Sequence, residues 1–331
     1  MQRIVFVAFL FLMSVQLTSC QKDVIEIKAE PLVSSKEEGV EYLAIFGDIQ
    51  FYTTSTYNHH FRHSLSWIEY QIENGVNIKS VLHTGDVCHN PNADSHWNCF
   101  DRAMADFSKV VPFYSMIGDH DYTWYDDIHI DGRNNTQFNE HLQFPLSMKN
   151  VIEQFESGRM ENVVVKNEIQ GQRIDLLILE FGPRKEVVDW ANAYVKAHPN
   201  HMFVLMTHEY LEKGGGRRVK GLKMAARLQN TTYTTPDQLW ERLIRCNDNI
   251  LCVLCGHVED LYDFTIDIND FGREVPQIQH NIQSPDFRYD NWLMLWEFPA
   301  DSDSANVFIY NTQTNKYYDD TTSLFRFKYR K

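Results

Sequence analysis

The stretch "YSMIGDHDYTWY", residues 114–125, ends an apolar run with a dense group of polar side chains. The run stops at Gly118, and Asp119, His120 and Asp121 follow without a spacer. Two carboxylates and an imidazole that are buried together repel one another or titrate unless a cation joins them. The stretch therefore predicts a strand that ends at a site for a positively charged ligand.

Four other runs share this design, because each is short, apolar and ends in Gly, Asp or His. They are "YLAIFGD" (42–48), "IKSVLHTGD" (78–86), "HMFVLMTHE" (201–209) and "ILCVLCGHVED" (250–260). Helix-like segments lie between the runs, at 60–75, 95–110, 185–198 and 236–246. Strands that alternate with helices predict a buried, largely parallel sheet, whose ligand site lies beyond the carboxyl ends of its strands. We therefore expect the polar ends of all five runs to converge.

Helix patterns stop after residue 270. Three later segments read as strands, with antiparallel pairing expected: "REVPQIQHNI" (273–282), "NWLMLWEF" (291–298) and "NVFIYNT" (306–312). "ENVVVKNEIQG" (161–171) and "RIDLLILEFG" (173–182) predict a hairpin pair. Because no repeat or internal linker is visible, we expect one domain over 41–331.

Composition limits the partners. The 331 residues are 43% hydrophobic and carry a formal net charge of −14. Binding to a nucleic-acid backbone needs a basic field and is not expected. A small anionic substrate is compatible with this charge, since bound metal ions can invert the local sign.

The N-terminus has the pattern of an export signal. Arg3 precedes an apolar run from Ile4 to Met13, which is too short for a comfortable membrane span. "LTSC" (17–20) resembles the lipobox of bacterial lipoproteins, which are cut before the cysteine that receives the lipid. We therefore predict a signal peptide over 1–19, a polar tether over 20–40 and a lipid anchor at Cys20 in the bacterial cell envelope. The outer membrane is favoured, because Cys20 followed by Gln21 does not match an inner-membrane retention signal.

Five further cysteines follow, and an odd number cannot all pair internally. Cys252 and Cys255 lie in an apolar strand-like run and are interpreted as core residues. A bridge between Cys88 and Cys99 stays open at this point.

As a set, the polar strand ends resemble the calcineurin-like metallophosphoesterases. That family has D-x-H, G-D, G-N-H-D/E, H and G-H-x-H in this order, and the resemblance runs from about Leu43 to the C-terminal strands. This chain has "GDIQ" (47–50), "GDVCH" (85–89), "GDHD" (118–121), "THE" (207–209) and "GHVE" (256–259). The resemblance implies a two-sheet α/β sandwich with mixed sheets, C-terminal antiparallel strands and two metal ions at the strand ends.

The resemblance also implies roles for individual residues. His120 would protonate the leaving group and Asp121 would orient His120. Asp86 would bridge the two metals. The remaining implied metal ligands are Asp48, Asp119, His208 and His257.

Three positions depart from the family pattern: Gln50 and Glu259 replace histidines, and Asp119 replaces asparagine. Glu259 is a competent ligand, whereas the carboxamide of Gln50 is a weak one. His89, three residues after Asp86, either supplies the missing imidazole or caps a loop.

The departures raise the number of carboxylate ligands. The expected set contains Asp48, Asp86, Asp119 and Glu259, and such oxygen-rich shells favour Mn²⁺ or Mg²⁺ over Zn²⁺. The implied reaction is hydrolysis of a small phosphoric mono- or diester by a hydroxide that the metals activate.

Two loops contain candidate substrate contacts. Arg217 and Arg218 in "EKGGGRRVKGLKMAAR" (212–227) either contact a phosphate or lie on a solvated loop. Tyr122 and Trp124 either form a stacking wall or belong to the core.

Two other functions compete with this interpretation. One is a catalytically degenerate surface lipoprotein that only binds, although Asp86, His120, His208 and His257 are all retained. The other is a hydrolase of diphosphates or phospholipid headgroups.

Overall fold

The computed structural model describes residue 32 and residues 39–126, 129–218, 227–228, 232–284, 286–287, 290–320 and 323–329. The predicted signal peptide, Cys20 and nearly all of the predicted tether lie outside these residues. Within them, no helix has both the length and the apolar character needed to cross a membrane.

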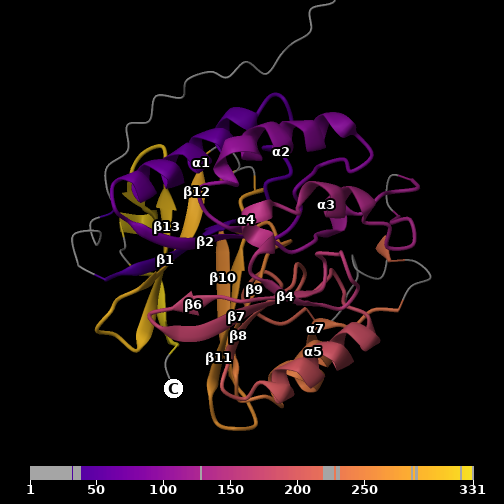
Figure 1. Cartoon of the computed structure of the whole chain (residues 1–331), viewed down its shortest axis with the longest axis vertical. Helices are drawn as coiled ribbons and strands as arrows, with labels where there is room; N and C mark the ends of the chain where they lie inside the picture. The colour runs from indigo at the N-terminus through magenta and orange to yellow at the C-terminus, as the bar shows by residue number, and fades with distance from the viewer. Residues whose placement is uncertain are drawn as a thin grey trace, which may run out of the picture.

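Two mixed sheets form the centre of the molecule (Figure 1). The first has the strand order β14-β13-β12-β1-β2-β3, with β15 beside β13, and the second has the order β10-β11-β9-β8-β7-β5-β4, with β6 beside β7. The strands of the first sheet are β1 (Glu41–Phe46), β2 (Asn77–His83), β3 (Phe113–Ser115), β12 (Trp292–Phe298), β13 (Ser304–Asn311), β14 (Lys316–Tyr317) and β15 (Phe325–Lys328). Those of the second are β4 (Val151–Gln154), β5 (Val163–Val165), β6 (Glu168–Ile169), β7 (Gln172–Ile178), β8 (Met202–Met206), β9 (Ile250–Cys255), β10 (Tyr262–Ile268) and β11 (Glu274–His280).

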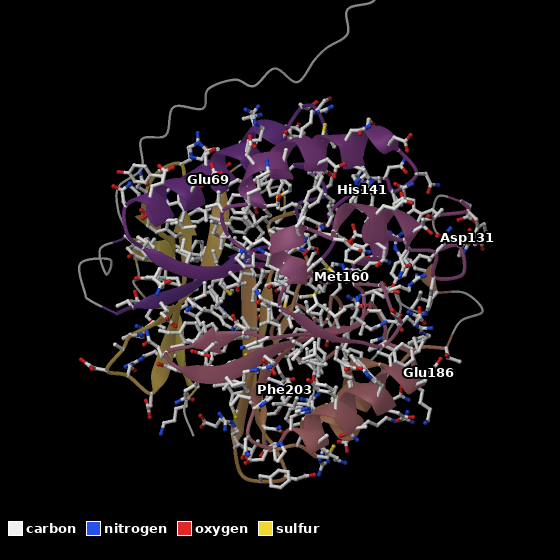
Figure 2. The ribbon with its side chains drawn as sticks, in the orientation of Figure 1. Glu69, Asp131, His141, Met160, Glu186 and Phe203 are labelled. Atoms are coloured by element: carbon white, nitrogen blue, oxygen red, sulfur yellow. The ribbon has the colours of Figure 1, made fainter. Side chains whose placement is uncertain are left out.

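Helices cover the outer faces of this sandwich, with α1 and α2 on one side and α5 and α7 on the other (Figure 1). Phe203 of β8 packs in the core between the second sheet and α5, whereas Glu186 lies exposed on α5 (Figure 2). The helices are α1 (Asn58–Glu73), α2 (Asp94–Phe107), α3 (Thr136–His141), α4 (Pro145–Met148), α5 (Lys185–Ala197), α7 (Pro236–Leu239) and three short η segments, η2 (Asp119–Asp121), η3 (Trp240–Ile244) and η4 (Tyr318–Asp320).

The predicted two-sheet α/β sandwich is confirmed. The five polar-ended runs form β1, β2, β3, β8 and β9. β2 pairs in parallel with β1 and β3 in the first sheet, and β8 pairs in parallel with β9 in the second. β1 pairs antiparallel with β12 from Glu41, which lies opposite Phe298, to Ile45, and its amino end lies at the opposite edge of the sheet from its carboxyl end. Parallel pairing brings the polar ends of β1, β2 and β3 together, and likewise those of β8 and β9.

Three details differ from the predictions. β11 was expected to pair antiparallel, but it pairs in parallel with β9 and antiparallel only with β10. β10 itself was not predicted. The helix predicted over 236–246 is divided into α7 and the π-helical segment η3. Within the described residues no disulfide joins Cys88 to Cys99, and both are buried, as are Cys252 and Cys255.

Candidate metal centre

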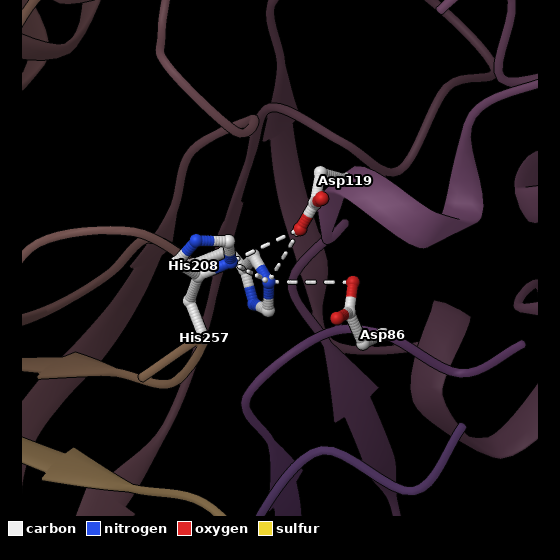
Figure 3. Close-up of side chains that lie close together, drawn as sticks. All are labelled: Asp86, Asp119, His208 and His257. Carbon is white, nitrogen blue, oxygen red and sulfur yellow. Dashed lines mark hydrogen bonds and ion pairs between the residues drawn. The ribbon is translucent and has the colours of Figure 1, made fainter. Parts of the chain in front are cut away.

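Four polar side chains converge at the carboxyl ends of the strands (Figure 3). Asp86 follows β2, Asp119 opens η2 after β3, His208 follows β8 and His257 follows β9. Each offers one ligand atom, and these four atoms all lie within 4.8 Å of one another. All four residues are at most 5% exposed, so water cannot compensate their charges.

The distances among these atoms are those of groups that share one cation. Nε2 of His208 lies 3.3 Å from Oδ1 of Asp86 and 3.2 Å from Oδ1 of Asp119. Nδ1 of His257 lies 3.0 Å from Oδ1 of Asp119 and 3.3 Å from Nε2 of His208. Ligands about 2.1 Å from one metal ion are separated by about 3 Å when they are adjacent in an octahedral shell.

A backbone carbonyl fixes the orientation of His208. Its Nδ1 lies 2.7 Å from the carbonyl oxygen of Thr84, to which it donates, and Nε2 therefore faces the carboxylates. Histidine ligands of metals are commonly held in this way.

The charges in this cluster are strongly coupled. Burial opposes the charged form of His208, but Asp86 and Asp48 outweigh burial and raise the pKa of His208 well above its usual range. Burial likewise opposes ionisation of Asp119, but His257 and His208 outweigh it and hold the pKa of Asp119 well below its usual range. A proton on His208 thus offsets part of the buried negative charge that a metal cation would offset.

Asp121 supports the backbone of the site. Its two carboxylate oxygens accept hydrogen bonds from the backbone N–H groups of Asp86 (2.9 Å), Val87 (2.7 Å), Cys88 (3.2 Å) and Gly118 (2.8 Å). Asp86 has φ = 58°, in the left-handed region where non-glycine residues need support. We predicted that Asp121 orients His120, but the structure gives its carboxylate this other task.

Two glycines make room for the carboxylates. A Cβ on Gly118 would collide with the side chain of Asp86, and a Cβ on Gly256 would collide with that of Asp48. The Gly-Asp and Gly-His pairs at the strand ends therefore reflect crowding in the site.

Asp48 lies beside the cluster in a cage of donors. Its Oδ1 accepts from Oγ1 of Thr84 at 2.7 Å. Its Oδ2 accepts from the backbone N–H of His257 (3.0 Å), Nδ2 of Asn281 (2.7 Å) and Nε2 of Gln283 (3.0 Å). Burial, only partly opposed by His208, raises the pKa of Asp48 well above its usual range. The sequence analysis had not identified Asn281 or Gln283.

His120 lies at the rim of the cluster and is partly exposed. Its backbone N–H donates to Oδ1 of Asp86 at 3.0 Å, and its Nδ1 lies 3.0 Å from the carbonyl oxygen of His89. With Nδ1 donating to this carbonyl, Nε2 is the ring nitrogen left for a substrate.

Arg227 is a site residue that the sequence analysis missed. Its Nε lies 2.5 Å from Oδ2 of Asp119, its guanidinium carbon lies 5.1 Å from the centre of the Trp124 ring, and its Nη2 lies 3.4 Å from Nε2 of His120. Nη1 is buried without a hydrogen-bond partner in the described part of the chain. The only signal was its position at the end of the basic stretch 212–227.

The structure places the other candidate residues as follows. Glu259 is exposed and outside the cluster, whereas Gln50 is buried, with its Oε1 unpartnered in the described structure. His89 is exposed, and its ring stacks on that of His120 at 5.7 Å between centres. Tyr122 is fully buried, which favours the core alternative.

The two arginines proposed for substrate binding are engaged in other ion pairs. Arg217 pairs with Asp237 and Asp267 and lies over the ring of Trp240. Arg218 pairs with Glu209 at 2.8 Å. Arg227, not either of these, reaches the cluster from the same stretch.

The residues present fit a divalent cation. Two carboxylate oxygens and two imidazole nitrogens are buried within 4.8 Å of one another, and the two nitrogens lie 3.3 Å apart. Mixed oxygen and nitrogen donors suit Zn²⁺, Mn²⁺ and iron.

One comparison with a solved structure shows the type of fold. No family model matches the chain. Purple acid phosphatase PPD1 from yellow lupin (Lupinus luteus) seeds superposes with a TM-score of 0.52 at 14% identity, over 87% of this chain and 54% of that chain. The fold is of the metallophosphoesterase type.

Two further comparisons add less. A 5'-nucleotidase precursor from Thermus thermophilus gives a TM-score of 0.44 at 13% identity, over 84% of this chain and 53% of that one. The uncharacterized protein YvnB of Bacillus subtilis (strain 168) is 26% identical over an alignment of 291 positions that covers 83% of this chain. The chain covers only 20% of YvnB, about a fifth of its length.

Proposed function

We propose that the protein is a metal-dependent phosphoric ester hydrolase that acts on a small mono- or diester. The observation that carries the proposal is the buried convergence of Asp86, Asp119, His208 and His257 at the strand ends. A divalent cation held there would polarise the phosphoryl oxygens and activate a water molecule.

His120 is proposed as the acid that protonates the leaving oxygen. It is partly exposed, next to the cluster, and fixed at Nδ1 by the carbonyl of His89. With Nδ1–H held by this carbonyl, the doubly protonated imidazolium would transfer its other proton from Nε2 and return to the neutral ring. A well-placed acid contributes about 10²–10⁴-fold to turnover.

Arg227 is proposed to bind the phosphate. Asp119 and Trp124 hold the guanidinium in place, and its Nη1 has no hydrogen-bond partner in the described residues. A buried donor without a partner is costly, and a phosphate oxygen would satisfy it.

A two-ion centre is part of the proposal. One ion would be held by Asp86, Asp119, His208 and His257, and the other by Asp48 together with Asp86. We expect Mn²⁺ or Mg²⁺ at the second of these positions. The exposure of Glu259 removes one of the four carboxylates on which the preference over Zn²⁺ was based, and the position with two imidazoles is equally suited to Zn²⁺.

We also propose that a lipid at Cys20 tethers the enzyme to the bacterial envelope. The support is the apolar N-terminal run followed by "LTSC". Incorporation of labelled lipid into the wild-type chain but not into Cys20→Ala would be the expected result, and labelling of both would refute the anchor.

Activity is tested with metal-free protein to which Mn²⁺, Mg²⁺ or Zn²⁺ is restored. Aryl and alkyl phosphate mono- and diesters, a diphosphate and a phospholipid serve as substrates. We expect metal-dependent turnover of a mono- or diester that Asp86→Asn abolishes and the surface variant Asp303→Asn retains. Turnover of only the diphosphate or the phospholipid would support the alternative hydrolase, and a folded, metal-loaded protein without turnover would support the binding lipoprotein.

A further inference from the structure

The side-chain amide of Gln283 lies between two carboxylates of the site. Its Nε2 is 3.0 Å from Oδ2 of Asp48 and 3.3 Å from Oδ2 of Asp86. All three side chains are buried, at 6% exposure or less. These separations match the 3.0–3.3 Å between the imidazoles and carboxylates of the metal centre, so the amide occupies a ligand's place relative to the two carboxylates.

Asp86 faces both positions with different oxygens. Oδ1 points to His208 at 3.3 Å, whereas Oδ2 points to Gln283. A carboxylate divided in this way can serve two cations, one on the side of His208 and one on the side of Asp48.

The two ends of a carboxamide have nearly the same shape but opposite roles. The NH₂ end donates to carboxylates, and the oxygen end binds cations. Without a cation, the NH₂ end of Gln283 neutralises part of the charge of Asp48 and Asp86. A half-turn of the amide about its last bond would replace this donor by an oxygen ligand.

A second amide oxygen lies close in sequence. Gln50 follows Asp48 by two residues, is 3% exposed, and its Oε1 has no hydrogen-bond partner within the described structure. Buried carbonyl oxygens without a partner are rare, and cation binding is one way to satisfy them.

We propose that Gln283 is a metal ligand that completes, with Asp48 and Asp86, an all-oxygen position beside the histidine-containing one. Gln50 supplies a further oxygen for this position. Such a donor set selects hard cations, Mg²⁺ or Mn²⁺, and binds Zn²⁺ poorly. The two positions therefore differ in metal preference. The inference rests on the proposed function for the existence of the neighbouring position.

Metal stoichiometry tests this inference independently of turnover. The metal-free full chain is loaded with excess Zn²⁺, desalted, analysed for zinc by mass spectrometry, and titrated with Mn²⁺ while the electron paramagnetic resonance of free Mn²⁺ is followed. We expect one retained zinc equivalent and one Mn²⁺ equivalent. Gln283→Ala should retain the zinc and weaken Mn²⁺ binding by about 10-fold or more, whereas the exposed control Gln313→Ala should match the wild type.

Two more variants keep the test decisive if Gln283→Ala does not fold. Gln283→His should convert the position to one that retains a second zinc equivalent, and Gln283→Glu should tighten Mn²⁺ binding. Unchanged Mn²⁺ affinity in a folded Gln283→Ala protein, two tightly held zinc equivalents in the wild type, or no effect of Gln283→Glu would overturn the inference. A wild-type protein that retains no zinc after desalting, or that turns over no ester, would count against the proposed function instead.

Discussion

Replacing Asp121 by asparagine should destabilise the protein without removing a proposed metal ligand. The carboxylate accepts four backbone hydrogen bonds, two at each oxygen. An amide keeps only one accepting oxygen and turns its NH₂ group towards the other two donors. A buried donor left without an acceptor costs about 1–3 kcal/mol, so the loss of two acceptors should lower the free energy of unfolding by about 2–6 kcal/mol.

The pH of the measurement matters. Burial and the neighbouring Asp86 raise the pKa of Asp121 to about 8 in the metal-free protein, against the effect of the amide donors. The folded protein therefore keeps this proton up to about pH 8, and the stability that it contributes is lost as the pH rises from about 4 to 8. Urea unfolding of metal-free wild type and Asp121→Asn should be compared at pH 6, and the difference in the free energy of unfolding should narrow towards pH 9, because only the wild type loses stability over this range.

A surface substitution supplies the control. Asp303→Asn removes an exposed carboxylate that lies 3.7 Å from Nζ of Lys328, and it should change the free energy of unfolding by no more than about 0.5 kcal/mol. A difference at pH 6 between Asp121→Asn and wild type as small as that of this control would refute the supporting role of Asp121.

Four further substitutions or conditions address the site and the core. Arg227→Ala should weaken inhibition by inorganic phosphate by about 10–150-fold, since a charge-assisted hydrogen bond contributes about 1.5–3 kcal/mol; an unaltered inhibition constant would contradict phosphate binding. His120→Ala should leave the metal content intact and slow alkyl esters far more than nitrophenyl esters, which leave readily without an acid; equal losses on both would exclude acid catalysis. Burial lowers the pKa of His83 to about 3 and of His280 to about 4, so the unfolded chain takes up protons first as the pH falls below about 6.5. Each of these two histidines should lower the free energy of unfolding by about 2 kcal/mol between pH 6.5 and 5. The free energy of unfolding of His280→Gln, measured with urea, should depend less steeply on pH than that of the wild type. Glu259→Gln should leave zinc content and turnover within about twofold of wild type, and loss of metal would show that the exposed Glu259 is nevertheless a ligand.

The sequence was informative wherever local pattern and local structure coincide. Short apolar runs with polar ends predicted β1, β2, β3, β8 and β9, because parallel strands buried on both faces must be apolar along their length and can be polar only where they end. The same logic predicted that the polar ends converge, and the resemblance to the metallophosphoesterases implied that Asp86, Asp119, His208 and His257 share one metal ion.

Residues that reach the site from elsewhere carried no such pattern. Arg227 comes from the end of a basic loop, and Gln283 comes from the segment after β11. Amides and arginines are common in loops, and only tertiary packing decides which of them turn inward. The role of Asp121 could not be predicted for a related reason. Its partners are backbone N–H groups, which nearly every residue possesses.

The course of β1 has a consequence for how substrate would reach an anchored enzyme. The strand starts just after the predicted tether and runs about 20 Å towards the metal centre, so the predicted tether joins the domain at the edge of the sheet opposite that centre. The chain from Cys20 to Gly39 spans at most about 65 Å when fully extended. A soluble ester in the surrounding fluid would reach the metal centre directly. A headgroup of the bilayer that holds the anchor would be reached only if the domain rotated on the tether until the metal centre faced the bilayer.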